Sequence, residues 1–429
     1  MLQIHWHSKT WFKLRFSGFT DEWNEDYLNK LFDNRNERNF ESLEVLSVTI
    51  NDGVLKRSDL GSDRKNKDKK SMKHVLKGDL VYNPMFMWKG ASGISSYEGI
   101  TSADYIVLKS KNNVNPIFFS HLFQTEKSLN KFKNYSQGSL LERLRLMYPQ
   151  FSDIKMAFPS YEEQEKIANL LTFVDNKIEL IEKKYQTYLD FKKYLMQQIF
   201  TQKLRFTDYI EEWKTIKLKD VGEINTGNTP STKVNEYYSP KKYLWVTPSD
   251  ISSKYIFDTA KRLSDEGAKK GRFVKKNSVL VTCIASIGKN CIILEDGYFN
   301  QQINSITPSQ SFDLDFIYYL IDYNSEKMKN YAGITATPIL NKKSFENMKF
   351  EFPSFDEQKQ ISNMLSNIDN KIFAIEELIN KTQKFKKGLL QQMFVVRINW
   401  RCNFKLAKSP SFNKHLLILK NKIIFIIIK

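Results

Sequence analysis

The feature that most constrains this chain is a long segment that occurs twice. Residues 158–200 read FPSYEEQEKIANLLTFVDNKIELIEKKYQTYLDFKKYLMQQIF, and residues 352–394 read FPSFDEQKQISNMLSNIDNKIFAIEELINKTQKFKKGLLQQMF. The copies align without a gap at an offset of 194 residues (352 − 158 = 194), with about half of the paired positions identical. Agreement over this length indicates duplication of a whole module.

Each copy has the pattern of one long amphipathic helix. Ser160 is followed by Glu163 and Ser354 by Glu357, behind an X-Pro lead-in, and this S-x-x-E spacing predicts a capping box at each start. Apolar residues then recur at alternating steps of four and three, the a/d spacing of a coiled coil. At about 1.5 Å per residue, each helix is expected to span roughly 60 Å.

The matched spacing predicts that the two helices pack on each other. Two unrelated surface helices are the alternative, but the same seam in both copies is explained more simply by pairing. Lys192 and Lys386 interrupt the seam at equivalent places. The expected helix–helix seam residues are Ile167, Leu171, Val174, Ile178, Ile181, Ile361, Leu365, Ile368, Ile372 and Ile375.

A shorter repeat opens each half of the chain. Residues 14–23 read LRFSGFTDEW and residues 204–213 read LRFTDYIEEW. The globular segments that follow mix strand-like runs with turns, and they resist alignment beyond scattered positions such as 77–79 with 276–278. The predicted organisation is a tail at 1–13, a first globular domain at 14–157, a helix at 158–203, a second globular domain at 204–351, a helix at 352–394 and a tail at 395–429.

Composition favours a polyanionic partner. The 66 Lys and Arg residues exceed the 48 Asp and Glu residues, for a formal charge of +18, and nucleic acid is the usual partner of such an excess. A generally basic protein from a Lys-rich proteome is the alternative. The three cysteines have no metal-ligand spacing, and their odd number suits a reducing cytosol. The first residues lack the apolar core of a signal peptide, so we expect a cytoplasmic protein.

Here the chain resembles the specificity subunit of type I restriction–modification enzymes. The resemblance covers about residues 14–394 and rests on the paired helices, the LRF…EW openings, and the motifs TGNTPS (226–231), WVTPSDI (245–251) and SIGK (286–289). It implies an α+β fold with two α/β target recognition domains, separated by two long antiparallel coiled-coil helices with a pseudo-two-fold internal repeat. Each domain is then expected to contact one half of a split, asymmetric site on double-stranded DNA.

The resemblance also implies partners. Two methyltransferase (modification) subunits dock on the scaffold of such a subunit, and two restriction (translocase–nuclease) subunits complete the enzyme. Those partners are expected to use S-adenosylmethionine, ATP and Mg, while this chain binds no cofactor and no metal and carries no catalytic centre. No association with a membrane is expected. The final apolar run is broken by Lys420, Asn421 and Lys422 and is too short to span a bilayer, so an unpacked tail is favoured over a peripheral anchor.

The motif search agrees with a non-catalytic role. Asn83-Pro84-Met85-Phe86 lacks the second Pro of an adenine methyltransferase motif and reads as the end of a strand. Gly288-Lys289-Asn290 lacks the first Gly and the Ser/Thr of a phosphate-binding loop. A self-contained restriction or modification enzyme and a coiled-coil scaffold without DNA specificity remain the alternatives.

Candidate DNA contacts are polar and basic residues in predicted loops. The segments 57–73, 85–92 and 135–145 supply them in the first domain, where a solvated loop or a helix cap is the competing interpretation. The expected DNA-binding residues are Arg64, Lys65, Lys67, Lys89, Ser92, Gln137, Arg143, Arg145, Thr226, Asn228, Thr229, Ser231, Ser249, Lys289, Asn300, Gln301, Thr335 and Thr337.

Overall fold

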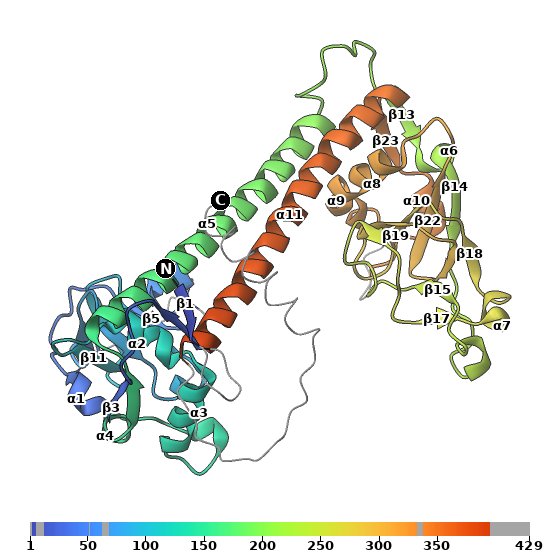
Figure 1. Ribbon diagram of the computed structural model, residues 1–429. Coiled ribbons are helices and arrows are strands. Elements are labelled where there is room, and N and C mark those ends of the chain that lie inside the picture. Colours follow the sequence, from blue (N-terminus) through green and yellow to red (C-terminus); the bar gives the residue numbers. More distant parts are fainter. Residues whose placement is uncertain (1, 6–12, 51, 62–67, 333–337, 395–429) are drawn as a thin grey trace. The chain divides into compact units, whose positions relative to one another are not determined.

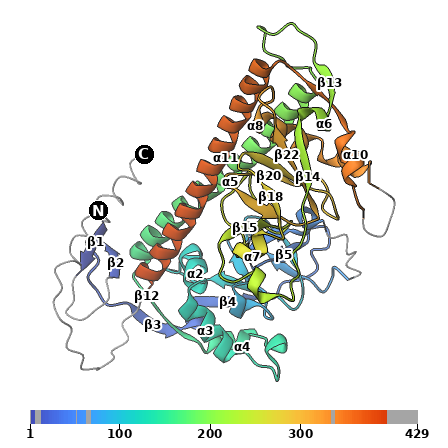
Figure 2. The same ribbon diagram turned by 90° about the vertical axis from the view of Figure 1, so that its right-hand side faces the viewer.

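A computed structural model of the chain describes residues 2–5, 13–50, 52–61, 68–332 and 338–394. The chain divides into two compact units (Figures 1 and 2). Unit 1 comprises residues 1–171 and 387–429, and unit 2 comprises residues 172–386. The division falls within both long helices, α5 (Tyr161–Phe200) and α11 (Phe355–Met393), each of which is continuous.

The globular part of unit 1 contains short strands and helices. Its core sheet has the antiparallel order β4-β11-β8-β9. The elements are β1 (Leu2–His5), β2 (Lys13–Phe16), β3 (Asn24–Tyr27), α1 (Leu28–Leu31), β4 (Phe32–Arg35), β5 (Leu46–Val48), β6 (Val54–Lys56), η1 (Arg57–Leu60), β7 (Lys73–Val75), β8 (Leu80–Tyr82), η2 (Met87–Lys89), β9 (Ser92–Ile94), β10 (Gly99–Thr101), β11 (Ile106–Ser110), α2 (Pro116–Phe123), α3 (Glu126–Tyr135), η3 (Leu141–Arg143), α4 (Tyr148–Ser152) and β12 (Lys155–Phe158).

The globular part of unit 2 is built around a sheet with the order β14-β22-β19-β20-β16, beside a second sheet β17-β15-β21-β18. Its elements are β13 (Lys214–Lys217), α6 (Leu218–Val221), β14 (Gly222–Thr226), η4 (Asn235–Tyr237), β15 (Tyr243–Val246), β16 (Tyr255–Ile256), β17 (Arg262–Leu263), α7 (Asp265–Ala268), β18 (Arg272–Val274), β19 (Ser278–Thr282), β20 (Asn290–Ile293), β21 (Gly297–Phe299), β22 (Ile303–Pro308), α8 (Leu314–Tyr323), α9 (Ser325–Lys329), α10 (Lys342–Glu346) and β23 (Lys349–Phe352).

The two globular parts share one core topology. The strand order β4-β11-β8-β9 of unit 1 matches β14-β22-β19-β20 of unit 2 in chain order and direction. The faint sequence echo at 77–79 and 276–278 marks equivalent turns, because Gly78 (φ +94°) and Asn277 (φ +61°) are both left-handed and lead into β8 and β19. Gly and Asn adopt this conformation more readily than other residues. The sheet framework therefore repeats where most of the sequence does not.

The long helices run antiparallel in unit 2, where two ion pairs join them. Lys192 Nζ lies 2.7 Å from Asp369 Oδ1, and Lys386 Nζ lies 2.5 Å from Asp175 Oδ1. Both the lysines and the aspartates are related by the repeat offset (192 + 194 = 386 and 175 + 194 = 369). The lysines that interrupt the apolar seam are thus the ends of two equivalent bridges, which gives the helix pair its pseudo-two-fold character.

The expected seam residues lie mostly in the interior. Nine are buried, and only Ile178 is half-buried. In unit 2, Ile361, Leu365, Ile368 and Ile372 share one apolar cluster with the globular domain. The N-terminal half of α11 therefore packs on the second domain as well as on α5.

The first turn of each helix differs from the predicted capping box. Glu163 accepts two hydrogen bonds of 2.7 Å from Arg15, and Glu357 accepts bonds of 3.1 and 2.8 Å from Arg205. In a capping box these carboxylates would bond back to the N–H of the serine, but here they are held by the arginines. The other half of the box forms in the second helix, where Ser354 Oγ accepts a bond of 3.4 Å from Glu357 N. The bond to Glu163 raises the pKa of Arg15 above its ordinary value.

The neighbouring glutamine ties each helix to its domain. Gln164 accepts a bond from the backbone N–H of Asn115 and donates to Pro159 O, both at 3.0 Å. Gln358 makes the same two bonds, to Asp313 and Pro353. Because Asn115 and Asp313 cap α2 and α8, the E-Q dipeptide positions an equivalent helix in each unit.

Each unit contains an aromatic cluster built from equivalent residues of the repeat. Trp23, Phe118 and Phe394 form a cluster in unit 1, with ring centroids 5.4–6.3 Å apart. In unit 2, Phe316 lies 6.1 Å from Trp213 and 5.7 Å from Phe200. The tryptophan of each LRF…EW opening thus packs in the same setting as its counterpart. Among the described residues no helix is long and apolar enough to cross a membrane.

Candidate nucleic-acid interface

In unit 2 the sequence-predicted contact residues gather at one end of the core sheet. Strands β14 and β19 finish at this end, with Thr226 and Thr282, while β22 and β20 begin there. Because the strands are antiparallel, the loops after Thr226, after Thr282 and before Ile303 must lie side by side. We call this the sheet end of unit 2.

The TGNTPS loop is hydrogen-bonded to the end of β21 and to the start of β22. Asn228 N donates to Phe299 O at 3.0 Å, and Thr226 Oγ1 donates to Asn304 Oδ1 at 2.6 Å. Thr229 Oγ1 donates to Gln301 Oε1. The structure therefore brings Thr226, Asn228 and Thr229 together with Gln301, although about 70 residues separate the two segments.

Other candidates of the second domain lie beside this loop. Val246 O at the end of β15 accepts a bond of 3.0 Å from Asn300 N, which places the following Thr247–Ser249 turn next to it. Ser249 is exposed and within 2.9 Å of Thr247 Oγ1. Ser231 is exposed in the TGNTPS loop, and Lys289 is exposed in the β19–β20 hairpin.

Unit 1 presents an equivalent sheet end. The connection from β8 to β9 corresponds to the hairpin that carries Lys289, and it carries Lys89. Lys89 Nζ lies 4.9 Å from the ring centroid of Trp88 and 5.5 Å from that of Phe86, and Lys133 Nζ from α3 lies 5.6 Å from Trp88. Such lysines over aromatic faces are favourable and leave part of each ammonium free for phosphate.

The segment 137–145 closes the same side of unit 1. Gln137 and Arg145 face each other as an antiparallel bridge with two backbone hydrogen bonds of 2.9 Å. Leu146 N then donates to Pro84 O at 3.0 Å, which mirrors the 2.8 Å bond from Leu340 N to Cys283 O in unit 2. Gln137, Arg143 and Arg145 are all exposed.

Two of the candidate residues are buried and form hydrogen bonds within their own domains. Ser92 is 4% exposed and accepts a bond of 3.1 Å from Gln124 Nε2, and Asn300 is 6% exposed and bonds to Gln302 through both amide atoms at 3.1 Å. In this structure both side chains shape loops and are not presented to a partner. Arg64, Lys65, Lys67, Thr335 and Thr337 lie outside the described residues, as does the tail 395–429.

Sequence reasoning missed Lys133 and Asn304. Lys133 lies 44 residues beyond Lys89 (133 − 89 = 44), and only the packing of α3 on η2 brings them to one tryptophan. Asn304 is buried, and it links Thr226 to Cys283, whose Sγ accepts from Asn304 Nδ2 at 3.2 Å. No local sequence pattern distinguishes these residues from other lysines and asparagines.

The Cys283 thiol bonded to Asn304 is buried. Burial raises the pKa of the Cys283 thiol to about 12, so it stays protonated at neutral pH and is a poor nucleophile. Among the described residues no group of three His, Cys, Asp or Glu side chains is placed to hold a metal ion.

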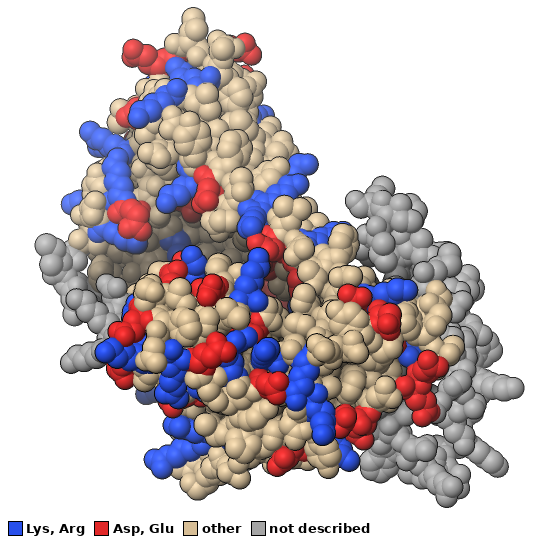
Figure 3. All heavy atoms as spheres, turned by 90° about the vertical axis from the view of Figure 1, so that its left-hand side faces the viewer, with Lys and Arg blue, Asp and Glu red and all other residues tan. Residues whose placement is uncertain are grey.

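The net charge is not gathered in one patch on the face of the molecule seen in Figure 3, where basic and acidic side chains alternate. Residues 395–429 contain eight Lys and Arg and no acid, so residues 1–394 carry +10 (18 − 8 = 10).

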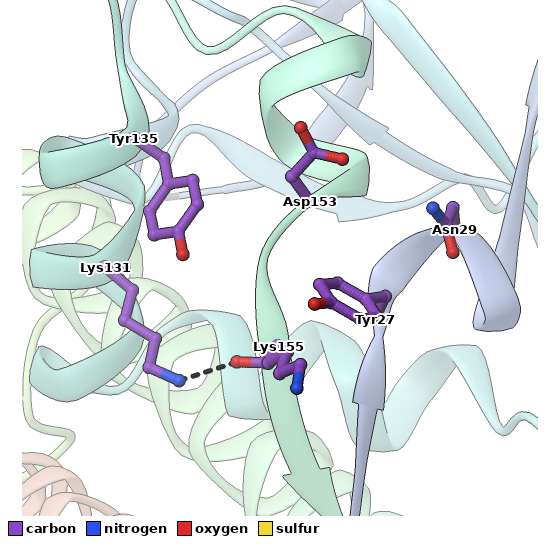
Figure 4. Close-up of a pocket in the computed structure, with 6 residues that line it drawn as sticks. All are labelled: Tyr27, Asn29, Lys131, Tyr135, Asp153 and Lys155. Atoms are coloured by element: carbon purple, nitrogen blue, oxygen red, sulfur yellow. Dashed lines mark hydrogen bonds between the residues drawn. The ribbon is translucent and has the colours of Figure 1, made fainter.

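A cleft in unit 1 is lined by none of the candidate DNA contacts. It has a volume of about 500 Å³ and is lined by Tyr27, Asn29, Lys131, Tyr135, Asp153 and Lys155 (Figure 4). Lys131 Nζ donates to Lys155 O at 2.6 Å, and Lys155 Nζ lies 4.7 Å from the Tyr27 ring. Burial lowers the pKa of Lys131. Both lysines thus have partners within the domain.

Gly227→Ala tests how the TGNTPS loop is held. A Cβ at position 227 would lie 2.2 Å from Asn300 O, so the loop must move, at a cost of about 1–3 kcal/mol. Gly388→Ala is the matched control, because a Cβ at that site of α11 meets nothing within 4 Å and alanine favours a helix by about 1 kcal/mol. In urea unfolding, Gly227→Ala should lower the free energy of unfolding and Gly388→Ala should raise it. Equal effects would contradict the close packing at Gly227.

A family profile and several known proteins match the chain. The profile of the "Type I restriction modification DNA specificity domain" matches residues 23–187 and 210–384. The MjaX specificity subunit of Methanocaldococcus jannaschii, a putative type I restriction enzyme subunit, is 23% identical over 373 residues, covering 82% of this chain and 85% of the relative. The MjaIX specificity subunit of the same organism is 28% identical over 209 residues, covering 47% of this chain and 46% of that one.

A solved structure has the same fold. The crystal structure of a type I restriction–modification S subunit from M. genitalium superposes with a TM-score of 0.55 and 14% identity, over 88% of this chain and 97% of the other. Each of the two profile matches, 23–187 and 210–384, lies within one half of the duplicated chain and runs from an LRF…EW opening into a long helix.

Proposed function

The chain belongs to the type I restriction–modification DNA specificity family and is a specificity subunit, and from this premise we propose how it reads DNA. Each globular domain binds one half of a bipartite, asymmetric target on double-stranded DNA through its sheet end. The observation that carries the proposal is the pair of equivalent sheet ends with unlike side chains, Lys89 with Gln137 and Arg145 in unit 1, and the TGNTPS loop with Gln301 in unit 2.

The helix pair is proposed to carry the partners. Both helices expose large apolar side chains, with Phe173 58% and Leu180 69% exposed on α5, and Phe373 64% exposed on α11. Exposed apolar residues on a charged helix favour docking of other protein surfaces. We propose that two methyltransferase and two restriction subunits assemble with this chain in the cytoplasm. These partners use S-adenosylmethionine, ATP and Mg, and this subunit supplies recognition without catalysis.

Methylation mapping tests the proposal. Genomic DNA from a host that carries this chain and its partners should show one split, non-palindromic motif. Loss of the motif on deleting this chain alone supports the function, and an unchanged map contradicts it. The isolated chain should transfer no methyl group, whereas a self-contained modification enzyme would. The comparisons give no support to that alternative or to a scaffold without DNA specificity.

Binding is expected to weaken steeply with salt. If six to ten phosphates are neutralised, affinity should fall roughly 10³- to 10⁵-fold between 50 and 200 mM salt, at about 0.9 in log affinity per contact. A titration of the methyltransferase-bound complex on its target duplex measures the slope. A flat titration would rule out contacts to the phosphate backbone as the source of affinity.

Exchanging one domain should change one half of the target. Replacing residues 204–351 with the matching segment of a relative is expected to alter one half-site and spare the other, because the apolar clusters of the two domains share no residue. Methylation mapping of the hybrid gives the readout. A change in both half-sites would show that the domains do not read independently.

A further inference from the structure

The loop between α3 and α4 of unit 1 exposes two leucines beside the proposed DNA contacts. Leu140 is 57% exposed and Leu141 is 56% exposed. Leucines in a folded domain are usually buried, and an adjacent pair at this exposure leaves a projecting apolar surface in water. The core of unit 1 uses neither side chain.

The backbone holds this loop in a defined shape. The Gln137–Arg145 bridge joins its two ends, and Arg143 N donates to Leu140 O at 2.9 Å, which closes a turn that contains both leucines. Gly138 makes the shape possible, since a Cβ there would lie 2.5 Å from Arg143 O and its φ is +153°. The apolar pair is therefore presented by a braced loop.

The surroundings of the loop favour nucleic acid over protein as its occupant. Arg143 and Arg145 follow the leucines in the same loop, and the segment 136–147 contains these two arginines and one glutamate. Leu146 N bonds to Pro84 O, which makes the loop continuous with the hairpin that carries Lys89. A duplex offers phosphates to the basic residues and an apolar space between stacked bases to the leucines.

We propose that Leu140 and Leu141 form a wedge that enters a base step at the half-site read by unit 1. This inference rests on the proposed function, because it needs the sheet end of unit 1 to face DNA. Apolar side chains inserted between base pairs unstack them partly and kink the duplex. The wedge makes unit 1 sensitive to how easily a step unstacks, in addition to the base edges that it contacts.

The test uses the full chain assembled with its methyltransferase partners and the target duplex found by mapping. 2-Aminopurine is placed in turn at each base of the unit 1 half-site other than the one that becomes methylated. Its fluorescence should rise on binding at one or two adjacent positions. The L140A/L141A variant should lose this rise and bind the target about tenfold more weakly, with unchanged affinity for unrelated DNA.

Two control variants separate a wedge from a general effect of substitution. Leu140→Phe keeps a large apolar side chain and should keep the signal, as should Ile210→Ala, which alters a 90% exposed residue of unit 2. Fluorescence that never rises, or that rises equally in L140A/L141A, overturns the wedge while leaving the proposed function intact. Loss of methyltransferase subunits from L140A/L141A overturns it in favour of protein docking. A target bound no better than a scrambled duplex overturns the proposed function, and the wedge with it.

Discussion

Replacing Ile372 with aspartate is expected to destabilise the helix pair by roughly 3–5 kcal/mol. Ile372 is 9% exposed and lies in the apolar cluster that joins α11 to the second domain. An aspartate there would be buried without a cationic partner, because the bridging Lys192 is already paired with Asp369. Urea unfolding measures the loss, and assembly with partners and binding to DNA should fall with it.

Two further variants sharpen this prediction. Ala374→Asp introduces the same charge two residues away at an exposed position, and it should unfold like the unaltered protein. Ile178→Asp changes the residue equivalent to Ile372 in the repeat, but Ile178 is half-buried, so a smaller loss is expected. If I372D melts like A374D, position 372 does not face the interior and the coiled-coil interpretation is wrong.

The repeat made the two long helices predictable, whereas the residues that their side chains contact could be identified only from the structure. The apolar spacing is a local pattern, and it located α5 and α11 to within a few residues. Glu163 was expected to cap its own helix, yet it binds Arg15, 148 residues away in the sequence. The repeat did hint at this pairing, since Arg15 and Arg205 occupy the same position in the two LRF…EW openings, as Glu163 and Glu357 do in the two helices. A linear sequence does not say which distant acid an arginine meets.

The sequence indicated the residue types of the candidate site better than it indicated where those residues lie in the fold. Polar loop residues of the second domain were selected by type, and the antiparallel sheet then gathers them at one end. Ser92 and Asn300 were selected by the same reasoning but are buried, because polarity alone does not report exposure. Leu140 and Leu141 were passed over, since an apolar pair suggests core until its surroundings are known.

Lengthening both helices by one heptad is expected to lengthen the gap between half-sites and leave their bases unchanged. The insertions follow Lys183 and Glu377, so the alternation of four and three is kept and each helix gains about 10 Å. At about 3.4 Å per base pair this is on the order of three more spacer pairs. Methylation mapping of the variant gives the readout, and methylation of the original target should be lost.

The contacts within each unit explain why this insertion should move a domain without disturbing it. Asp175 and Lys386 both lie on one side of the two insertion points, and Lys192 and Asp369 both lie on the other, so neither bridge is broken. The second domain is tied to the helix segment 355–377, because Tyr319 Oη donates to Asp369 at 2.5 Å and Lys254 Nζ donates to Ser366 Oγ at 2.9 Å.

The first domain is tied to the other side of the insertion, through Arg15 with Glu163 and Trp23 with Phe394. Each recognition domain should therefore travel with its own helix segment as one body. Three extra base pairs also rotate the second half-site by roughly 100° on a helix of about 10.5 pairs per turn, so the new spacer is expected to be the nearest length that restores both contacts. A heptad added to α5 alone is the control, because it shifts the two bridges out of register and should abolish methylation. An active double insertion that keeps the original spacer would show that helix length does not set the distance.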